Sequence, residues 1–86
     1  MYKIRTASRR VEREIDRVPP PVFDRVAAAI QSLTETPRPV GVKKIRDDTF
    51  RIRVGHYRVI YVVDDAAREI IITRVVERSE ATYRGL

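Results

Sequence analysis

The sequence contains no cysteine, and this absence excludes several classes of protein. Without cysteine the chain has no disulfide framework, no thiolate zinc site and no cysteine nucleophile. Its single histidine, His56, argues equally against a histidine-rich metal site. The chain has three glycines and no G-x-x-x-x-G-K-S/T pattern, which argues against a loop that cradles nucleotide phosphates. We therefore predict no metal and no cofactor.

Long apolar runs are also absent. No stretch approaches the roughly 20 residues that span a membrane, and residues 1–6 run directly into charge without a signal-peptide core. A length of 86 residues allows one hydrophobic core, so residues 1–86 are predicted to form a single domain. With 43% hydrophobic residues the chain is too apolar to be disordered. The sequence predicts a small cytoplasmic domain with no membrane partner.

Cations are in excess, and their type is informative. Lys and Arg number 18 against 12 Asp and Glu, which gives a net charge of +6. All of these cations are arginine except Lys3, Lys43 and Lys44. Guanidinium binds phosphate in bidentate fashion and stacks on bases, so the bias favours contact with nucleic acid. A genome rich in G and C would produce the same bias, and composition alone leaves both explanations open.

The first half of the chain has helical periodicity after a short strand. Residues 2–6 alternate and are rich in strand formers. Apolar residues then recur at helical spacing over 7–18, and again over 22–33. Prolines 19–21 separate the two segments, because proline ends one helix and suits the first turn of the next. This pattern predicts two antiparallel helices.

After Gly41 the period changes to two. The expected strands are residues 42–46, 50–54, 57–63 and 69–76, and the strand at 57–63 is apolar enough to be buried on both faces. Together with the first half, this predicts an α+β fold: a short N-terminal strand, two antiparallel helices, and a mainly antiparallel sheet of three to four strands with the helices packed on one face.

Three arginines are expected on the other face of this sheet. The apolar residues within 50–54 alternate with Arg51 and Arg53, so both arginines face away from the helices. Arg58 reaches their side across a tight turn, because antiparallel neighbours lie about 5 Å apart. Guanidinium groups this close repel one another, and such a cluster is typical of an anion site. The alternative is a solvated face with acidic partners nearby.

Other candidates are weaker. The acidic pairs at 47–48 and 64–65 fall where turns are expected, and aspartate is common in turns. His56 can take part in proton transfer, although a turn residue is the simpler interpretation. Tyr83 can donate a hydrogen bond, stack on a base or anchor the C-terminal tail.

The segment from Lys44-Ile45 to Phe50-Arg-Ile-Arg-Val-Gly-His-Tyr-Arg-Val-Ile-Tyr61 strongly resembles the RelE/ParE superfamily of bacterial and archaeal toxins, and residues 78–84 resemble its terminal segment. The resemblance covers nearly the whole chain. It implies the toxin of a type II toxin–antitoxin system. RelE-like members enter the ribosomal A site and cut mRNA there without a metal, by attack of a 2′-OH on the adjacent phosphate.

The resemblance also implies roles for individual residues. Arg51 and Arg53 would bind phosphate, Arg58 would stabilise the phosphorane charge, Arg78 would be the terminal arginine, and Tyr83 would orient the nucleophile or stack on a base. Beside this catalytic set, Lys43, Lys44, Arg46 and His56 are expected to bind RNA.

The sequence departs from the family pattern at the two lysines of the best-known RelE active site and at the histidine before the terminal arginine, which is Glu77 here. Both lysines of that site are Arg here, Arg51 and Arg53, and arginine does not give up its proton near neutral pH. If the protein cuts RNA, the proton of the attacking 2′-OH must therefore go to Glu77, Glu80, His56 or Tyr83, to the ribosome, or to solvent. Two other functions stay open, a ParE-like inhibitor of DNA gyrase and an inactive homologue that only binds an antitoxin. A cognate antitoxin is the expected partner in every case.

Overall fold

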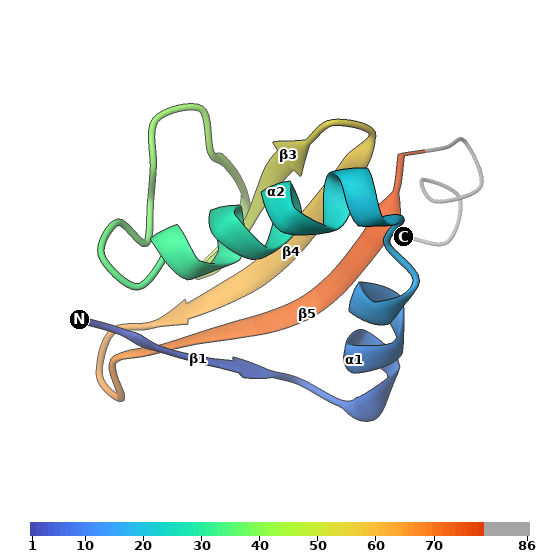
Figure 1. Ribbon diagram of the computed structural model, residues 1–86. Helices are drawn as coiled ribbons and strands as arrows, with labels where there is room; N and C mark the ends of the chain where they lie inside the picture. Colours follow the sequence, from blue (N-terminus) through green and yellow to red (C-terminus); the bar gives the residue numbers. More distant parts are fainter. Residues whose placement is uncertain (79–86) are drawn as a thin grey trace.

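The computed structural model describes residues 1–78. Their elements are β1 (Lys3–Thr6), α1 (Arg9–Asp16), α2 (Pro20–Ser32), β2 (Lys43–Arg46), β3 (Thr49–Val54), β4 (Tyr57–Asp64) and β5 (Glu69–Glu77). The strands form one sheet in the order β1-β5-β4-β3-β2 (Figure 1). The predicted α+β class and the predicted order of elements are confirmed.

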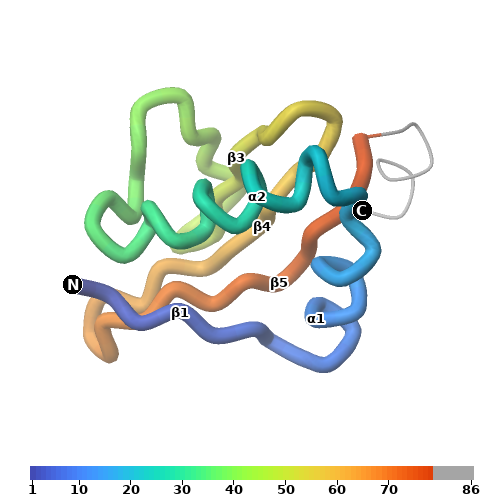
Figure 2. Tube along the Cα trace, in the orientation of Figure 1, coloured from blue at the N-terminus to red at the C-terminus, as the bar shows by residue number. Residues whose placement is uncertain are grey.

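Four of the strands form an antiparallel meander, and the first strand joins it at an edge. β2, β3, β4 and β5 pair as successive antiparallel neighbours. β1 pairs in parallel with β5, the last strand along the chain (Figure 2). A parallel pair requires a long connection between its strands. Here the connection contains both helices and the strands β2 to β4. The alternation of residues 2–6 predicted this strand but not its partner.

Each helix packs chiefly on strands. α1 contacts β5 and β1, whereas α2 contacts β3 and β4. Pro19 is the N-cap of α2 and Pro20 its first residue, where a missing N–H costs nothing. The core between helices and sheet contains fully buried residues from both layers, among them Val11, Val26 and Leu33 from the helical half and Tyr61 and Ile70 from the sheet.

β4 is buried along almost its whole length, as its apolar sequence predicted. It lies between β3 and β5, and its alternate residues face the helices and the opposite side of the sheet. We call that opposite side the outer face. Within residues 1–78 no helix is long and apolar enough to cross a membrane.

Candidate nucleic-acid interface

A tight hairpin turn brings two of the predicted arginines directly opposite each other. Gly55, with φ of 60°, occupies the turn between β3 and β4, where glycine adopts a positive φ without strain. The register that follows pairs Arg53 with Arg58 and Arg51 with Ile60. Side chains of directly paired residues share a face, so Arg51, Arg53 and Arg58 all lie on the outer face.

Arg58 is buried within this group, with only 1% of its surface exposed. Burial lowers the pKa of the Arg58 guanidinium, and the positive charges of Arg51, Arg53 and Arg78 lower it further. Both effects disfavour the charged form. We call Arg51, Arg53, Arg58 and Arg78 the arginine cluster. Four cations this close together attract negatively charged groups.

Arg78 joins the cluster because its backbone is tied to the hairpin turn. The Arg78 N–H donates a hydrogen bond of 2.5 Å to the carbonyl oxygen of His56. This bond holds the residue after β5 beside the turn that connects β3 to β4. His56 itself is exposed in that turn, as its sequence context predicted.

The structure divides the predicted RNA-binding residues between the two sides of the sheet. Lys43 pairs with Arg51, and the two side chains line a cleft of about 480 Å³ together with Arg53. Arg46 pairs with Thr49 and also lies on the outer face. Lys44 pairs with Phe50, a core residue, so Lys44 lies on the helix side, away from the cluster.

The candidate proton acceptors differ in their position relative to the arginine cluster. Glu77 pairs with Tyr57, which packs against the core, so Glu77 is on the helix side of the sheet and not with the cluster. Glu80 and Tyr83 lie outside the described residues. His56, the remaining candidate, is exposed and accepts the backbone hydrogen bond from Arg78 described above.

Sequence reasoning missed an apolar cleft on the outer face. It has a volume of about 420 Å³, and Ile45, Ile60 and Val62 line it between Arg46 and Arg74. Irregular pairing at Ile45 in β2 and at Thr73 in β5 shapes this region. The only sequence signal is the unbroken apolar run of β4, because bulges have no simple sequence pattern.

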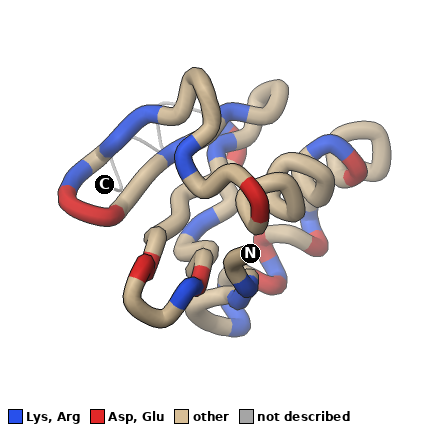
Figure 3. Tube along the Cα trace, turned by 90° about the vertical axis from the view of Figure 1, so that its left-hand side faces the viewer, with Lys and Arg blue, Asp and Glu red and all other residues tan. Residues whose placement is uncertain are grey.

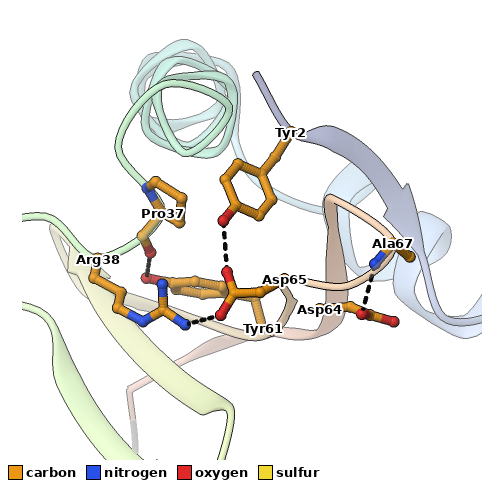
Figure 4. Close-up of polar contacts among 7 residues, drawn as sticks. All are labelled: Tyr2, Pro37, Arg38, Tyr61, Asp64, Asp65 and Ala67. Atoms are coloured by element: carbon orange, nitrogen blue, oxygen red, sulfur yellow. Dashed lines mark hydrogen bonds and ion pairs between the residues drawn. The ribbon is translucent and has the colours of Figure 1, made fainter.

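A different charged group lies at the other end of β4. Asp65 accepts a hydrogen bond of 2.5 Å from the Tyr2 hydroxyl and one of 2.9 Å from the Arg38 guanidinium (Figure 4). These two bonds are the main reasons why the pKa of Asp65 is lowered. We call Tyr2, Arg38 and Asp65 the Asp65 network. It joins the residue before β1, the loop after α2 and the turn after β4.

The acidic turn residues are structural, as predicted. Asp64 accepts a hydrogen bond of 3.0 Å from the backbone N–H of Ala67, which is a typical aspartate turn. Within residues 1–78 no three His, Cys, Asp or Glu side chains gather in a way that could hold a metal ion.

Comparison with known proteins gives consistent results. Residues 5–82 match the family described as the ParE toxin of a type II toxin–antitoxin system. The curated toxin RelE1 of Methanocaldococcus jannaschii is 32% identical over 90% of each chain.

Solved structures share the fold. The isolated RelE toxin of Escherichia coli superposes with a TM-score of 0.80 at 21% identity, covering 99% of this chain and 95% of that one. A chain of the RelBE2 toxin–antitoxin complex of Mycobacterium tuberculosis has a TM-score of 0.76 at 30% identity, covering 90% of this chain and 98% of that one.

Proposed function

The chain belongs to the ParE toxin family of type II toxin–antitoxin systems, within the RelE/ParE superfamily, and from this premise we propose that it cuts mRNA in the ribosomal A site. The observation that carries the proposal is the arginine cluster on the outer face, in which Arg58 is buried beside three further cations. A buried cation with three cations close to it suits a ligand that brings negative charge to the group.

The proposed reaction is attack of a ribose 2′ oxygen on the adjacent phosphorus. A bond forms between the 2′ oxygen and phosphorus, the bond from phosphorus to the 5′ oxygen breaks, and negative charge grows on the equatorial oxygens. Guanidinium groups are well suited to stabilise that charge, and that of Arg58 is held in place by burial before the ligand arrives. Arg58 would stabilise the pentavalent phosphorus, with Arg51 and Arg53 binding the phosphate.

The arginines do not accept the proton of the 2′ hydroxyl at neutral pH. We propose that His56 accepts it, because His56 is exposed and its carbonyl oxygen is hydrogen-bonded to Arg78 of the cluster, whereas Glu77 is on the other side of the sheet. The departing 5′ oxygen takes a proton from water. If His56 has this role, His56→Gln slows cutting while RNA binding is retained.

Primer extension on mRNA in programmed ribosomes tests the proposal. We expect A-site cuts with the native protein and a loss of about 100-fold or more with Arg58→Ala, the scale seen when one charge-stabilising group is removed from an active site. Arg38→Ala is the matched control, because it removes an arginine from the Asp65 network at the other end of β4. Full cutting by a folded Arg58→Ala variant would contradict the assignment.

A second candidate is inhibition of DNA gyrase, favoured by the ParE description of the matching family. Here the protein would act by contact with another protein and would not cut RNA. A supercoiling assay with purified gyrase separates the two functions. Gyrase inhibition by a protein that gives no A-site cuts would replace the first proposal with the second.

We also propose an antitoxin partner with an acidic, amphipathic segment that covers the outer face. Support comes from the M. tuberculosis neighbour, which was solved as a toxin–antitoxin complex, and from the apolar cleft flanked by Arg46 and Arg74. Charge-led recognition by a chain of net charge +6 weakens as salt is added. A dissociation constant that does not change with salt would contradict this mode of binding.

A further inference from the structure

A second group of arginines lies at the free edge of β5. β1 pairs with β5 only as far as Ile72, and beyond that point α1 lies beside the end of β5 in place of a strand (Figures 1 and 2). A cleft of about 520 Å³ separates α1 from this end of β5. We call it the α1 cleft. Arg10, Arg13 and Arg17 line one wall, and Tyr57 and Glu77 line the other.

Helical spacing explains why these arginines face the cleft together. Residues three and four positions apart lie on the same side of a helix, and Arg10, Arg13 and Arg17 follow this spacing. Val11, from the opposite side of α1, is fully buried in the core and so fixes the rotation of the helix. The arginine side of α1 is therefore held in position by packing on its other side.

Glu14 is the acidic residue of α1 that lines the cleft, and it is already engaged. Glu14 accepts hydrogen bonds from the Nε of Arg74 at 2.9 Å and from the Val75 N–H at 2.8 Å, which attaches α1 to the edge of β5. Arg10 is 3.5 Å from the same carboxylate. Within residues 1–78, Arg13 and Arg17 have no carboxylate at ion-pair distance. The α1 cleft thus contains cations in excess over acids.

We propose that the α1 cleft binds the phosphodiester backbone of RNA, at a site separate from the arginine cluster. The inference rests on the proposed function, because it takes RNA as the ligand. Arg10 and Arg17 are about 10 Å apart along the helix axis, at about 1.5 Å per residue. That distance spans roughly three stacked nucleotides at about 3.4 Å each. Guanidinium groups bind phosphate oxygens in bidentate fashion.

Two observations favour RNA over an acidic peptide. A peptide needs apolar anchors to build a stable interface, and the side of α1 that lines the cleft presents arginines and one glutamate. Of the two valines on the opposite wall, Val75 is buried in the core and Val76 pairs with Arg58 on the outer face. The half-buried ring of Tyr57 offers instead a surface on which a base can stack. Tyr57 and Arg58 are successive residues of β4 and face the two sites from opposite sides of the sheet, so one RNA that rounds the His56 turn reaches both.

Fluorescence anisotropy with a labelled single-stranded RNA of about 20 nucleotides tests the inference without the ribosome. The test variant is Arg13→Gln with Arg17→Gln. The matched control is Lys3→Gln with Arg9→Gln, which removes the same charge from exposed positions that do not line the cleft. We expect the test variant to bind roughly 10-fold more weakly, with a salt slope smaller by about 1.4. The control should stay within about twofold of the native protein.

Equal weakening in both double variants would overturn the inference, because binding would then follow net charge and not the cleft. A labelled oligoglutamate peptide provides a further comparison. If its binding depends on Arg13 and Arg17 while RNA binding does not, the cleft is a protein site and the proposal is wrong.

Failure of this inference is distinguishable from failure of the proposed function. A-site cutting combined with unchanged RNA binding by the test variant would remove the α1 cleft as an RNA site and leave the endonuclease. Cleft-dependent RNA binding by a protein that gives no A-site cuts would remove the endonuclease and leave the cleft.

Discussion

The arginine cluster and the Asp65 network lie toward opposite ends of β4, and in both the pKa of a charged residue is lowered. The meaning is opposite in the two places. The pKa of Asp65 falls because a hydroxyl and a guanidinium bind its charged form. The pKa of Arg58 falls because burial and three neighbouring cations oppose its charged form. One end of the strand therefore gains stability from its charges, whereas the other holds charge at an electrostatic cost.

This difference separates a structural site from a candidate functional one. Acidic and basic segments alternate at the end of the molecule where the N terminus lies (Figure 3), and the Asp65 network joins three segments there. At the other end, the positive charges of Arg51, Arg53 and Arg78 act on the buried guanidinium of Arg58. A protein retains such an arrangement where a ligand of opposite charge completes it.

The largest effect is expected from Arg51→Ala combined with Arg53→Ala. Loss of both phosphate-binding groups should reduce A-site cutting by about 100-fold to 1000-fold, because each group acts on the same developing charge. The free energy of unfolding in urea should not fall, since the change relieves repulsion on Arg58. A variant that loses stability and activity together would show that the cluster is structural, like the Asp65 network.

The next largest effect is expected from alkaline pH, which should lower the free energy of unfolding through Tyr61, a residue close to the Asp65 network (Figure 4). Burial raises the pKa of Tyr61 to about 12, and its hydroxyl donates a hydrogen bond of 2.7 Å to the carbonyl oxygen of Pro37. The unfolded chain ionises this tyrosine near its ordinary pKa of 10.0. Stability from the neutral hydroxyl is complete below pH 10 and is lost as pH rises toward 12, by about 2–3 kcal/mol.

Tyr61→Phe is the control for this prediction. It should lower the free energy of unfolding at neutral pH by about 1 kcal/mol through the lost hydrogen bond. In urea unfolding, the free energy of unfolding of the variant should also decrease less steeply with pH above pH 10 than that of the native protein. An equally steep fall in the variant would assign the alkaline effect to other tyrosines. A-site cutting should be unchanged, since Tyr61 faces the helices.

A smaller effect is expected from added salt, which should stabilise the fold by screening the repulsion within the arginine cluster. Screening reduces repulsion within the arginine cluster, and Arg53→Ala removes part of that repulsion beforehand. When salt is raised to physiological strength, we expect the free energy of unfolding to rise by roughly 0.3 kcal/mol more in the native protein than in Arg53→Ala. The measurement is paired urea unfolding at low and physiological salt. Identical gains would indicate that the exposed guanidinium of Arg53 does not contribute to the repulsion.

The smallest effect is expected at Asp65. Its lowered pKa means that it stabilises the fold when charged, and this stability is lost as pH falls through the folded pKa of the carboxyl. Asp65→Asn should therefore lower the melting temperature slightly at neutral pH and not in strong acid. A difference that persists unchanged in strong acid would show that the amide disturbs the turn itself.

Local sequence pattern was sufficient to predict the central part of the site. Strict alternation in β3 and a turn at Gly55 determine which face Arg51, Arg53 and Arg58 share. These are short-range properties, because a period of two and a positive φ each depend on a few adjacent residues. The order of elements followed from the same kind of signal.

Long-range packing decided the rest. The pattern around Lys43 predicted a strand, but only its pairing with β3 showed that Lys43 joins the outer face while Lys44 does not. The parallel pairing of β1 and the attachment of Glu14 to β5 depend on contacts between residues about 60 positions apart. Single-sequence patterns do not encode such contacts.

The sequence by itself determined that this protein has strands of alternating character and an excess of arginine on one face of its sheet. Only the tertiary structure decided that Arg58 is buried, that Arg78 stands beside it and that α1 faces the edge of β5 with its arginines. The physical reason is that charge repulsion and burial depend on distance in space. Arg78 is held near Arg58 because its backbone N–H is hydrogen-bonded to the carbonyl oxygen of His56, in the turn before β4.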